Sequence, residues 1–290
     1  MSDSLFSLPI EQQLTPSLTL RKKDDLSIIV INHPKATAAI ALQGAHLLSW
    51  QPKGEMPVIW LSQSSQFKTG AAIRGGVPIC WPWFGKAGTP SHGFARNELW
   101  QLTEHSENED GVWLTFSLED NPHTRQIWPY AFRLIARIKI NTTCEIELES
   151  HGDYPVTCAL HTYLNIADIS QVNVSGLGGH YMDKVIGGEH DSTEKALTFN
   201  GPIDRIYTQP ESVSLIQDPV AGRSIEIHHR NATDVVTWNP GAEGASGMSD
   251  MENDGYKTMV CVETASVSNP VDVRNDRPQR LSSIILCRRN

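Results

Sequence analysis

The chain has 290 residues, of which 39% are hydrophobic and 20% charged, and this composition indicates an ordinary globular protein with a sizeable core. Its 24 Lys and Arg against 33 Asp and Glu give a formal net charge of -9, which argues against nucleic acid as a partner and against attraction to an anionic membrane surface. The five cysteines are scattered and form no CxxC pair, so neither a disulfide framework nor a zinc knuckle is indicated.

The N-terminal stretch 1–17 lacks the basic and apolar regions of a signal peptide, and no later stretch is long and apolar enough to span a bilayer. Together with the cysteine pattern, this predicts a protein of the cytoplasm. We expect a single domain over 1–290, with about residues 1–25 as an N-terminal extension packed on it.

From residue 26 onward the chain repeats short segments rich in Val, Ile, Leu and Thr, each bounded by Gly, Pro, Asn or Asp, as is typical of β-strands. The predicted strands cover 26–31, 36–42, 56–62, 111–120, 132–140, 144–150, 154–161, 212–218, 224–229, 234–240, 258–264 and 281–287. Residues 100–120 predict a hairpin, and residues 239–257 a flexible polar loop that could move over a site. No long helical pattern competes, so we predict an all-β protein with two large antiparallel sheets packed face to face and a groove on one of them.

Residues 74–96, RGGVPICWPWFGKAGTPSHGFAR, crowd glycines, prolines and four large aromatic residues between Arg74 and Arg96, with no acidic residue. The final SHGFAR sets His92, a glycine that permits close approach, and Arg96 in one short loop. The simplest alternative is a surface loop with a basic tip. Lys86, in the middle, either assists the two arginines in binding a ligand or is a solvated charge of the loop.

Two polar residues interrupt apolar strands. His161 stands in CALHTYLNI and Glu263 in TMVCVETAS. Burying an imidazole or a carboxylate costs free energy unless it is paired or used, so both are candidates for chemistry. The alternatives are a satisfied core histidine and a glutamate that faces solvent at the end of its strand.

Several other chemistries are poorly supported. There is no GxSxG elbow for a serine hydrolase, and GLGGHY at 176–181 opens no helix that could bind phosphate. His92, His161 and Glu263 could supply a His₂Glu zinc set, but HExxH and close-spaced ligand pairs are absent. We therefore expect no metal.

Six segments, in order, carry a family resemblance: RGGVPICWPWFG with HGFAR, LHTYLNI, GPIDRIY, VVTWNPG and CVETA. Over about residues 26–286 the chain closely resembles the aldose 1-epimerase (mutarotase) superfamily, and specifically its hexose-6-phosphate branch. The resemblance implies a large antiparallel β-sandwich, the galactose-mutarotase-like supersandwich. This agrees with the strand prediction.

The resemblance also implies an isomerase that interconverts the α and β anomers of a hexose 6-phosphate, with D-glucose 6-phosphate as the expected substrate. Ring opening needs a base for the O1 proton and an acid for the ring oxygen. The family's catalytic glutamate and histidine match Glu263 and His161, which we expect to be ionised and protonated, respectively, in the resting enzyme. No cofactor is implied, because no electrons or groups leave the substrate.

By the same resemblance, Arg74 and Arg96 match phosphate-binding arginines, whose guanidinium forks suit bidentate capture of phosphate. His92 matches a histidine that lines the sugar site. Asp204 matches an aspartate that binds sugar hydroxyls, although an aspartate after Gly-Pro also suits a turn. Ser91 stands where relatives often have glutamine, so that substrate contact is absent, bridged by water or replaced.

Some roles and functions stay open at this level. Trp81, Trp83 and Phe84 could face the sugar or pack in the core, and Trp238 has no assigned role. The alternative functions are an epimerase of unphosphorylated aldoses and a non-catalytic sugar-binding β-sandwich. A glycoside hydrolase is less well supported, because such enzymes usually use two opposed carboxylates rather than a histidine and a glutamate. The expected partner is a small phosphosugar, without nucleic acid or membrane, and the expected state is a monomer.

Overall fold

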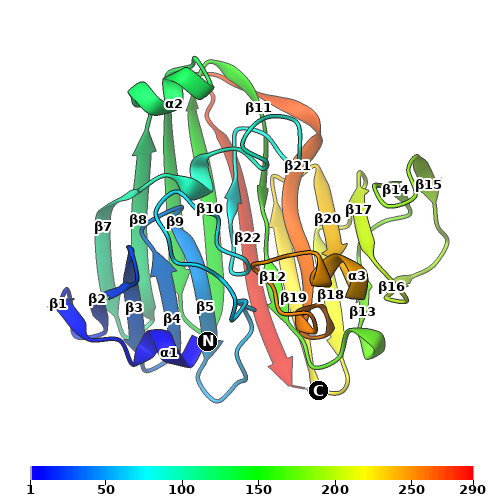
Figure 1. The fold of residues 1–290 in the computed structure, drawn as a ribbon, viewed down its shortest axis with the longest axis horizontal. Helices are drawn as coiled ribbons and strands as arrows, with labels where there is room; N and C mark the ends of the chain where they lie inside the picture. Colours follow the sequence, from blue (N-terminus) through cyan, green and yellow to red (C-terminus); the bar gives the residue numbers. More distant parts are fainter. Residues whose placement is uncertain (1, 290) are drawn as a thin grey trace.

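The computed structural model describes residues 2–289 and confirms the all-β prediction. Within this part of the chain, antiparallel strands form sheets of nine, eight and five strands (Figure 1). The nine-stranded sheet makes one layer of a sandwich, and the other two sheets lie side by side against it as the second layer. Single-residue bridges tie each of these two sheets to a connecting segment: Leu47 of the five-stranded sheet pairs with Val77, and Leu164 of the eight-stranded sheet pairs with Ile59.

The nine-stranded sheet has the order β16-β13-β18-β19-β22-β10-β9-β8-β7. Its strands alternate buried and exposed residues, as in β8, so one face meets the other layer and the opposite face meets solvent. The strands are β7 (Gln101–Asn108), β8 (Gly111–Glu119), β9 (Phe132–Ile140), β10 (Thr143–Gly152), β13 (Asn173–Ser175), β16 (Ala196–Thr198), β18 (Val213–Asp218), β19 (Arg223–Arg230) and β22 (Gln279–Arg289).

The five-stranded sheet runs in chain order, β1-β2-β3-β4-β5. Its strands are β1 (Ile10–Gln13), β2 (Leu18–Lys23), β3 (Leu26–His33), β4 (Ala36–Ala41) and β5 (His46–Pro52). The expected N-terminal extension therefore contributes β1, the edge strand, and β2, which lies between β1 and β3.

The eight-stranded sheet has the order β15-β14-β17-β20-β21-β11-β6, and β12 pairs with β21 beside this path. Its strands are β6 (Ile79–Cys80), β11 (Tyr154–Leu160), β12 (Tyr163–Asn165), β14 (His180–Asp183), β15 (Glu189–Asp191), β17 (Ile203–Tyr207), β20 (Asp234–Asn239) and β21 (Met259–Val273). In Figure 1 the short strands β14 and β15 project at the right-hand edge. The 15-residue β21 forms the centre of this sheet.

One large apolar cluster fills the space between the layers, with side chains from all three sheets, for example Ile40 of β4, Val262 of β21 and Ile285 of β22. Burial of such apolar area is the dominant favourable term in folding. The core is therefore continuous across both layers.

Helices are short in residues 2–289. The α-helices are α1 (Ser2–Phe6), α2 (Pro122–Ile127) and α3 (Gly241–Ser246), and 3₁₀ helices cover Ala95–Asn97, Ile169–Gln171 and Gly255–Thr258. Helix α2 begins with a capping box, in which the Asn121 side chain accepts from the backbone N–H groups of His123 and Thr124.

Two local predictions were wrong. Residues 56–62 form no strand, because this buried segment crosses between the two sheets of the second layer and bonds to a different neighbour at each step: the N–H of Val58 donates to Trp50 and that of Trp60 to Tyr163. Residues 239–257, predicted as a flexible polar loop, contain α3 and the last 3₁₀ helix, and their apolar residues Ala245 and Met251 are buried.

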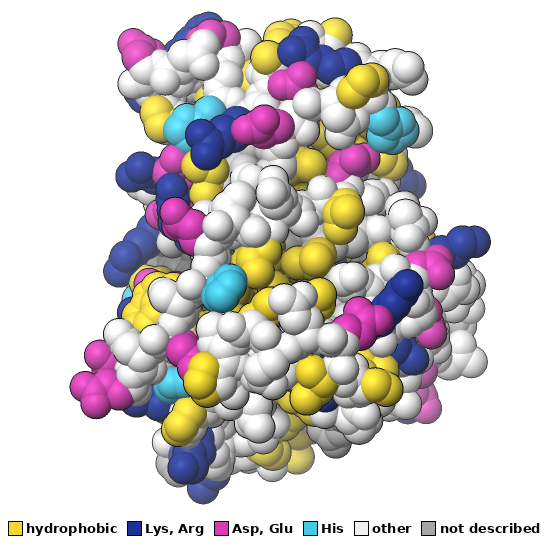
Figure 2. Space-filling model, turned by 90° about the vertical axis from the view of Figure 1, so that its left-hand side faces the viewer, with side chains coloured by type: hydrophobic (Ala, Val, Ile, Leu, Met, Phe, Trp, Pro, Cys, Tyr) yellow, Lys and Arg dark blue, Asp and Glu magenta, His cyan; other side chains and the backbone are white. Residues whose placement is uncertain are grey.

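The surface in Figure 2 carries basic and acidic side chains that are interspersed, with apolar groups between them. This face therefore shows no one-signed patch of the kind that would bind a polyanion. No helix among residues 2–289 has the length and apolar character needed to cross a membrane.

Candidate active site

Strand register gathers a row of side chains on one face of the eight-stranded sheet. Asp204 of β17 pairs with Trp238 of β20, Trp238 with Cys261 of β21, and Cys261 with Tyr163 of β12. Side chains that are directly opposite in an antiparallel pair lie on the same face. Four residues that are far apart in the sequence are therefore neighbours in space.

Glu263 joins this row because side chains alternate along a strand, which places it on the same face as Cys261. Its neighbour Thr264 points the other way, into the sandwich, where its hydroxyl contacts Nδ1 of the buried His229 at 2.7 Å. The candidate site thus lies on the face of the eight-stranded sheet that is turned away from the nine-stranded sheet.

His161 follows the end of β11, where its backbone N–H donates to the carbonyl of Pro78. Its ring stacks on Tyr163 with centroids 4.8 Å apart and an interplanar angle of 7°, and it meets Trp238 edge-on. These contacts hold the imidazole above the sheet, opposite Glu263.

The loop over residues 74–96 covers this face, and Gly93 explains how it folds. Gly93 has a φ of +71°, and a Cβ there would lie 2.0 Å from the carbonyl oxygen of Trp81, so only glycine fits. The loop closes tightly enough to bring the ring of His92 to 5.4 Å from that of His161.

All the predicted site residues line one cavity of about 700 Å³, a volume within the usual range for small-molecule sites. They are Arg74, Ser91, His92, Arg96, His161, Asp204 and Glu263. The sequence blocks that carried the family resemblance therefore meet around a single space.

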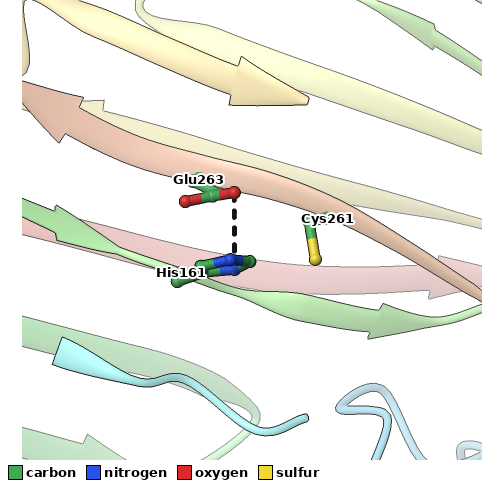
Figure 3. Close-up of side chains that lie close together, drawn as sticks. All are labelled: His161, Cys261 and Glu263. Atoms are coloured by element: carbon green, nitrogen blue, oxygen red, sulfur yellow. Dashed lines mark ion pairs between the residues drawn. The ribbon is translucent and has the colours of Figure 1, made fainter. Parts of the chain in front are cut away.

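His161 and Glu263 face each other at its base, with Nδ1 of His161 3.3 Å from Oε1 of Glu263 (Figure 3). Both side chains are buried, and neither Nδ1 nor either carboxylate oxygen has a hydrogen-bond partner among residues 2–289. Burial, reinforced by Asp204, raises the pKa of Glu263 well above its usual value, although Lys184 opposes this. Burial and the neighbouring His92 and Arg96 lower the pKa of His161 well below its usual value.

These directions oppose the expected resting charges, an ionised Glu263 and a protonated His161. Burial favours instead a protonated carboxyl and a neutral imidazole, because desolvation penalises both charged forms. The two arrangements contain the same number of protons and differ only in which side chain holds one. Transfer of that proton between the two facing atoms interconverts them.

His92 is held as a neutral hydrogen-bond donor. Burial, Arg96 and Lys184 lower its pKa to about 3, and its Nδ1 accepts from the backbone N–H of Gly85 at 3.3 Å. Since Nδ1 is the acceptor, the ring proton must sit on Nε2. The imidazole can therefore donate a hydrogen bond from Nε2.

The two predicted arginines differ in what they contact. Arg74 donates from Nε to Asp250 at 3.2 Å and from Nη1 to the hydroxyl of Tyr163 at 3.0 Å. Burial alone would lower its pKa, but Tyr163 and Asp250 raise the pKa above the usual value. Arg96 donates from Nη2 to the carbonyl of Ser91, and its buried Nε has no partner in the described chain. Arg96 thus keeps more donor capacity for a ligand.

Two cavity residues were missed by sequence reasoning. Lys184 follows β14, and its Nζ lies 5.7 Å from the ring centroid of Phe84. Asp250, inside the predicted loop, pairs with Arg74 at 3.1 Å. In sequence each looks like an ordinary charge in a turn, and only strand pairing and loop packing reveal its place. With Lys184, and with Lys86 of the 74–96 loop, four cationic side chains line the cavity, the others being Arg74 and Arg96.

Asp204 also lines the cavity as expected, and burial raises its pKa, with Lys184 acting in the opposite direction. Ser91, in place of the usual glutamine, turns its hydroxyl to the carbonyl of Gly85 at 3.1 Å. The aromatic residues divide between two roles: Trp81 is fully buried in the core, whereas Phe84 and Trp238 line the cavity. Trp238, to which the sequence assigned no role, therefore belongs to the cavity wall.

Comparison with known proteins gives consistent matches over nearly the whole chain. The profile of the family described as aldose 1-epimerase matches residues 27–282. A Salmonella typhimurium protein described as "Putative glucose-6-phosphate 1-epimerase" is 50% identical over 293 residues, covering 98% of each chain. An Escherichia coli K12 protein with the same description is 49% identical over 289 residues, also covering 98% of each chain. A crystal structure described as a "putative mutarotase" from Salmonella typhimurium has a TM-score of 0.99 at 50% identity and covers 100% of each chain.

Proposed function

The chain belongs to the aldose 1-epimerase family, and from that premise we propose that it interconverts the α and β anomers of a hexose 6-phosphate, D-glucose 6-phosphate above all. The single observation that carries this function is the facing pair of His161 and Glu263 in a cavity that four cationic side chains also line. Such a pair supplies acid and base for ring opening, and such cations suit a phosphorylated ligand.

In the proposed mechanism Glu263 removes the proton from the C1 hydroxyl while His161 protonates the ring oxygen. The C1–O5 bond breaks and the C1–O1 bond becomes the carbonyl of the open-chain aldehyde. Because Nδ1 of His161 faces Glu263, Nε2 is the nitrogen left to meet the sugar. Rotation about C1–C2 and reclosure on the other face return both protons, so the protein ends as it began.

The reactive charge state must form when the sugar binds. The sugar's hydroxyls replace part of the hydration that Glu263 and His161 lost on burial, and this favours the ionised pair over the neutral one. Lys184 acts in the same direction, since it lowers the pKa of Glu263. We propose that substrate binding moves the shared proton from Glu263 to His161.

Around this pair we assign substrate contacts. His92 donates from Nε2 to a sugar oxygen, Asp204 accepts from sugar hydroxyls, and the rings of Phe84 and Trp238 offer apolar faces to the sugar. The phosphate, with a charge of about −1.5 to −2 near neutral pH, lies toward Arg74 and Arg96. In a chain of net charge -9, these local cations provide the attraction that the whole molecule does not.

Asp250 pairs with Arg74 and so weakens the attraction of that arginine for a phosphate. One rival function therefore remains, an epimerase of unphosphorylated aldoses. The two functions separate in one experiment, in which anomer exchange of glucose 6-phosphate and of glucose is followed by exchange NMR with the unmodified protein. We expect the catalysed rate of anomer exchange to be at least about tenfold higher for glucose 6-phosphate than for glucose. One hydrogen bond to a charged group is worth about this factor. Equal rates would favour the rival, and no acceleration of either sugar would reject the enzyme.

The five cysteines are free thiols in the structure, which supports a reducing compartment, and we propose the cytoplasm. The large apolar side chains with the highest exposure, such as Ile10, Leu99 and Ile186, come from separate segments, so we propose a monomer.

A further inference from the structure

A third donor lies beside the catalytic pair. Cys261 precedes Glu263 by two residues on β21 and therefore points to the same side of the sheet (Figure 3). One ligand atom each from His161, Cys261 and Glu263 lie within 4.8 Å of one another, and all three residues are buried. The sulfur belongs to no step of the proposed reaction.

The lone pairs in this cluster are unused. Nδ1 of His161 and both carboxylate oxygens of Glu263 have no hydrogen-bond partner within residues 2–289. The 3.3 Å between Nδ1 and Oε1 matches an edge of a zinc tetrahedron, in which bonds of about 2.0–2.2 Å separate neighbouring N and O ligands by about 3.3–3.6 Å. Two of the three donors are therefore already spaced for a shared metal ion.

We propose that His161, Cys261 and Glu263 bind Zn²⁺ as a reversible inhibitor. Three protein ligands with an open fourth position are a usual arrangement for zinc, and here the fourth position opens toward the cavity, which His161 and Glu263 line. The thiolate favours zinc and similarly thiophilic cations over Mg²⁺ and Ca²⁺, which prefer oxygen ligands. The thiol proton of Cys261 and the carboxyl proton of Glu263 leave to solvent as the metal–ligand bonds form.

Inhibition, unlike binding, rests on the proposed function. A bound ion occupies the carboxylate that would take the O1 proton and fixes the imidazole that would protonate the ring oxygen. Arg96 and Lys184 line the same cavity and repel a second cation, so we expect weaker binding than at a four-ligand structural site. A resident metal cofactor is not implied.

Binding can be tested without any activity measurement. Co²⁺, which substitutes for Zn²⁺ in such sites, gives a near-ultraviolet charge-transfer band when bonded to a thiolate. Titration of the metal-free protein with Co²⁺ should produce this band, and added Zn²⁺ should abolish it. Cys261→Ser should lose the band, whereas Cys287→Ser, which removes a partly exposed thiol, should keep it. X-ray absorption of the zinc complex should show one sulfur neighbour, a readout that needs no variant.

Inhibition is tested by anomer exchange with Zn²⁺ added. Measured against its own metal-free rate, Cys261→Ser should need at least about tenfold more Zn²⁺ for half inhibition than the unmodified protein, since even loss of an outer-shell partner costs that much affinity. A missing cobalt–thiolate band, a zinc complex without sulfur, or a band lost in Cys287→Ser instead would overturn the metal site. An inactive metal-free protein would overturn the proposed function and leave the spectroscopic result standing.

Discussion

The imidazole of His161 and the carboxyl group of Glu263 face each other across 3.3 Å, and both side chains are buried. Glu263 lies on β21, and His161 directly follows β11. The antiparallel pairing of these two strands holds the contact in place. A pair of this kind can accept a proton at one atom and release one at another without changing its total charge. That property suits a reaction whose substrate and product have the same number of protons.

Glu263→Gln should abolish catalysis. Glutamine has nearly the same shape but cannot accept the O1 proton, and a positioned acid or base contributes about 10²- to 10⁴-fold to a rate. Exchange NMR on glucose 6-phosphate should show a fall of at least about 100-fold. The matched control is Glu243→Gln on α3, a residue that does not line the cavity, and it should leave the rate unchanged. Comparable activity in the two variants would remove Glu263 from the mechanism.

Arg96→Ala should act on the phosphorylated sugar selectively. Its guanidinium has a buried, unpartnered Nε, and a hydrogen bond to a charged group is worth about 1.5–3 kcal/mol. We expect kcat/KM for glucose 6-phosphate to fall about 10- to 100-fold, with little change for glucose. Arg133→Ala, on β9 of the nine-stranded sheet and outside the cavity lining, is the matched control and should leave both rates unchanged. A proportional loss on both sugars would show that Arg96 supports the loop rather than the phosphate.

Lys184→Met should move the pH profile. Lys184 lowers the pKa of Glu263, so its removal raises that pKa further, and the carboxyl group then ionises only at higher pH. The acid limb of kcat/KM against pH should shift to higher pH, and Lys184→Arg should restore the original position. An unshifted acid limb in Lys184→Met would mean that the ammonium group does not act on Glu263.

Acid should destabilise the fold through its buried histidines. Burial lowers the pKa of His229 from 6.5 to about 4, so between these values the unfolded chain binds a proton that the folded chain does not. Stability is complete above about pH 6.5 and falls as the pH is lowered, by about 1.4 kcal/mol per pH unit for this group and about 3 kcal/mol in all.

His229→Gln provides the matched variant, because an amide can keep the contacts with Thr264 and Ser214 but cannot gain the proton. The free energy of unfolding should be measured with urea at pH steps from 6.5 to 4. Its dependence on pH should be weaker in this variant, by the amount that corresponds to one proton. Identical slopes for the two proteins would mean that His229 is protonated in the folded state.

The sequence predicted the strands best where apolar residues alternate over six or more positions, as in 111–120 and 132–140. It failed at 56–62, since an apolar run shows that a segment is buried but does not show whether one neighbour or several take its hydrogen bonds. It also missed short strands such as β14 and β17, in which polar and apolar residues mix over only four and five positions.

The candidate site was predictable only in part. Residues on the apolar strands and in the unusual 74–96 loop stood out because their chemistry conflicts with their surroundings. Lys184 and Asp250 did not, because a charged residue in a turn is the normal case and its neighbours across the cavity come from distant segments. The charge state of the catalytic pair depends on desolvation, which no sequence pattern reports.

The alternation of side chains along β21 limits how this protein can diverge. Deleting or inserting one residue between Cys261 and Thr264 would swap the two sides of the strand, sending the carboxylate into the hydrocarbon interior and a threonine into the cavity. Insertions and deletions that change the sugar preference are therefore expected in the segments that cover the cavity, such as the 74–96 loop. Their lengths can vary without changing which side of β21 each residue faces.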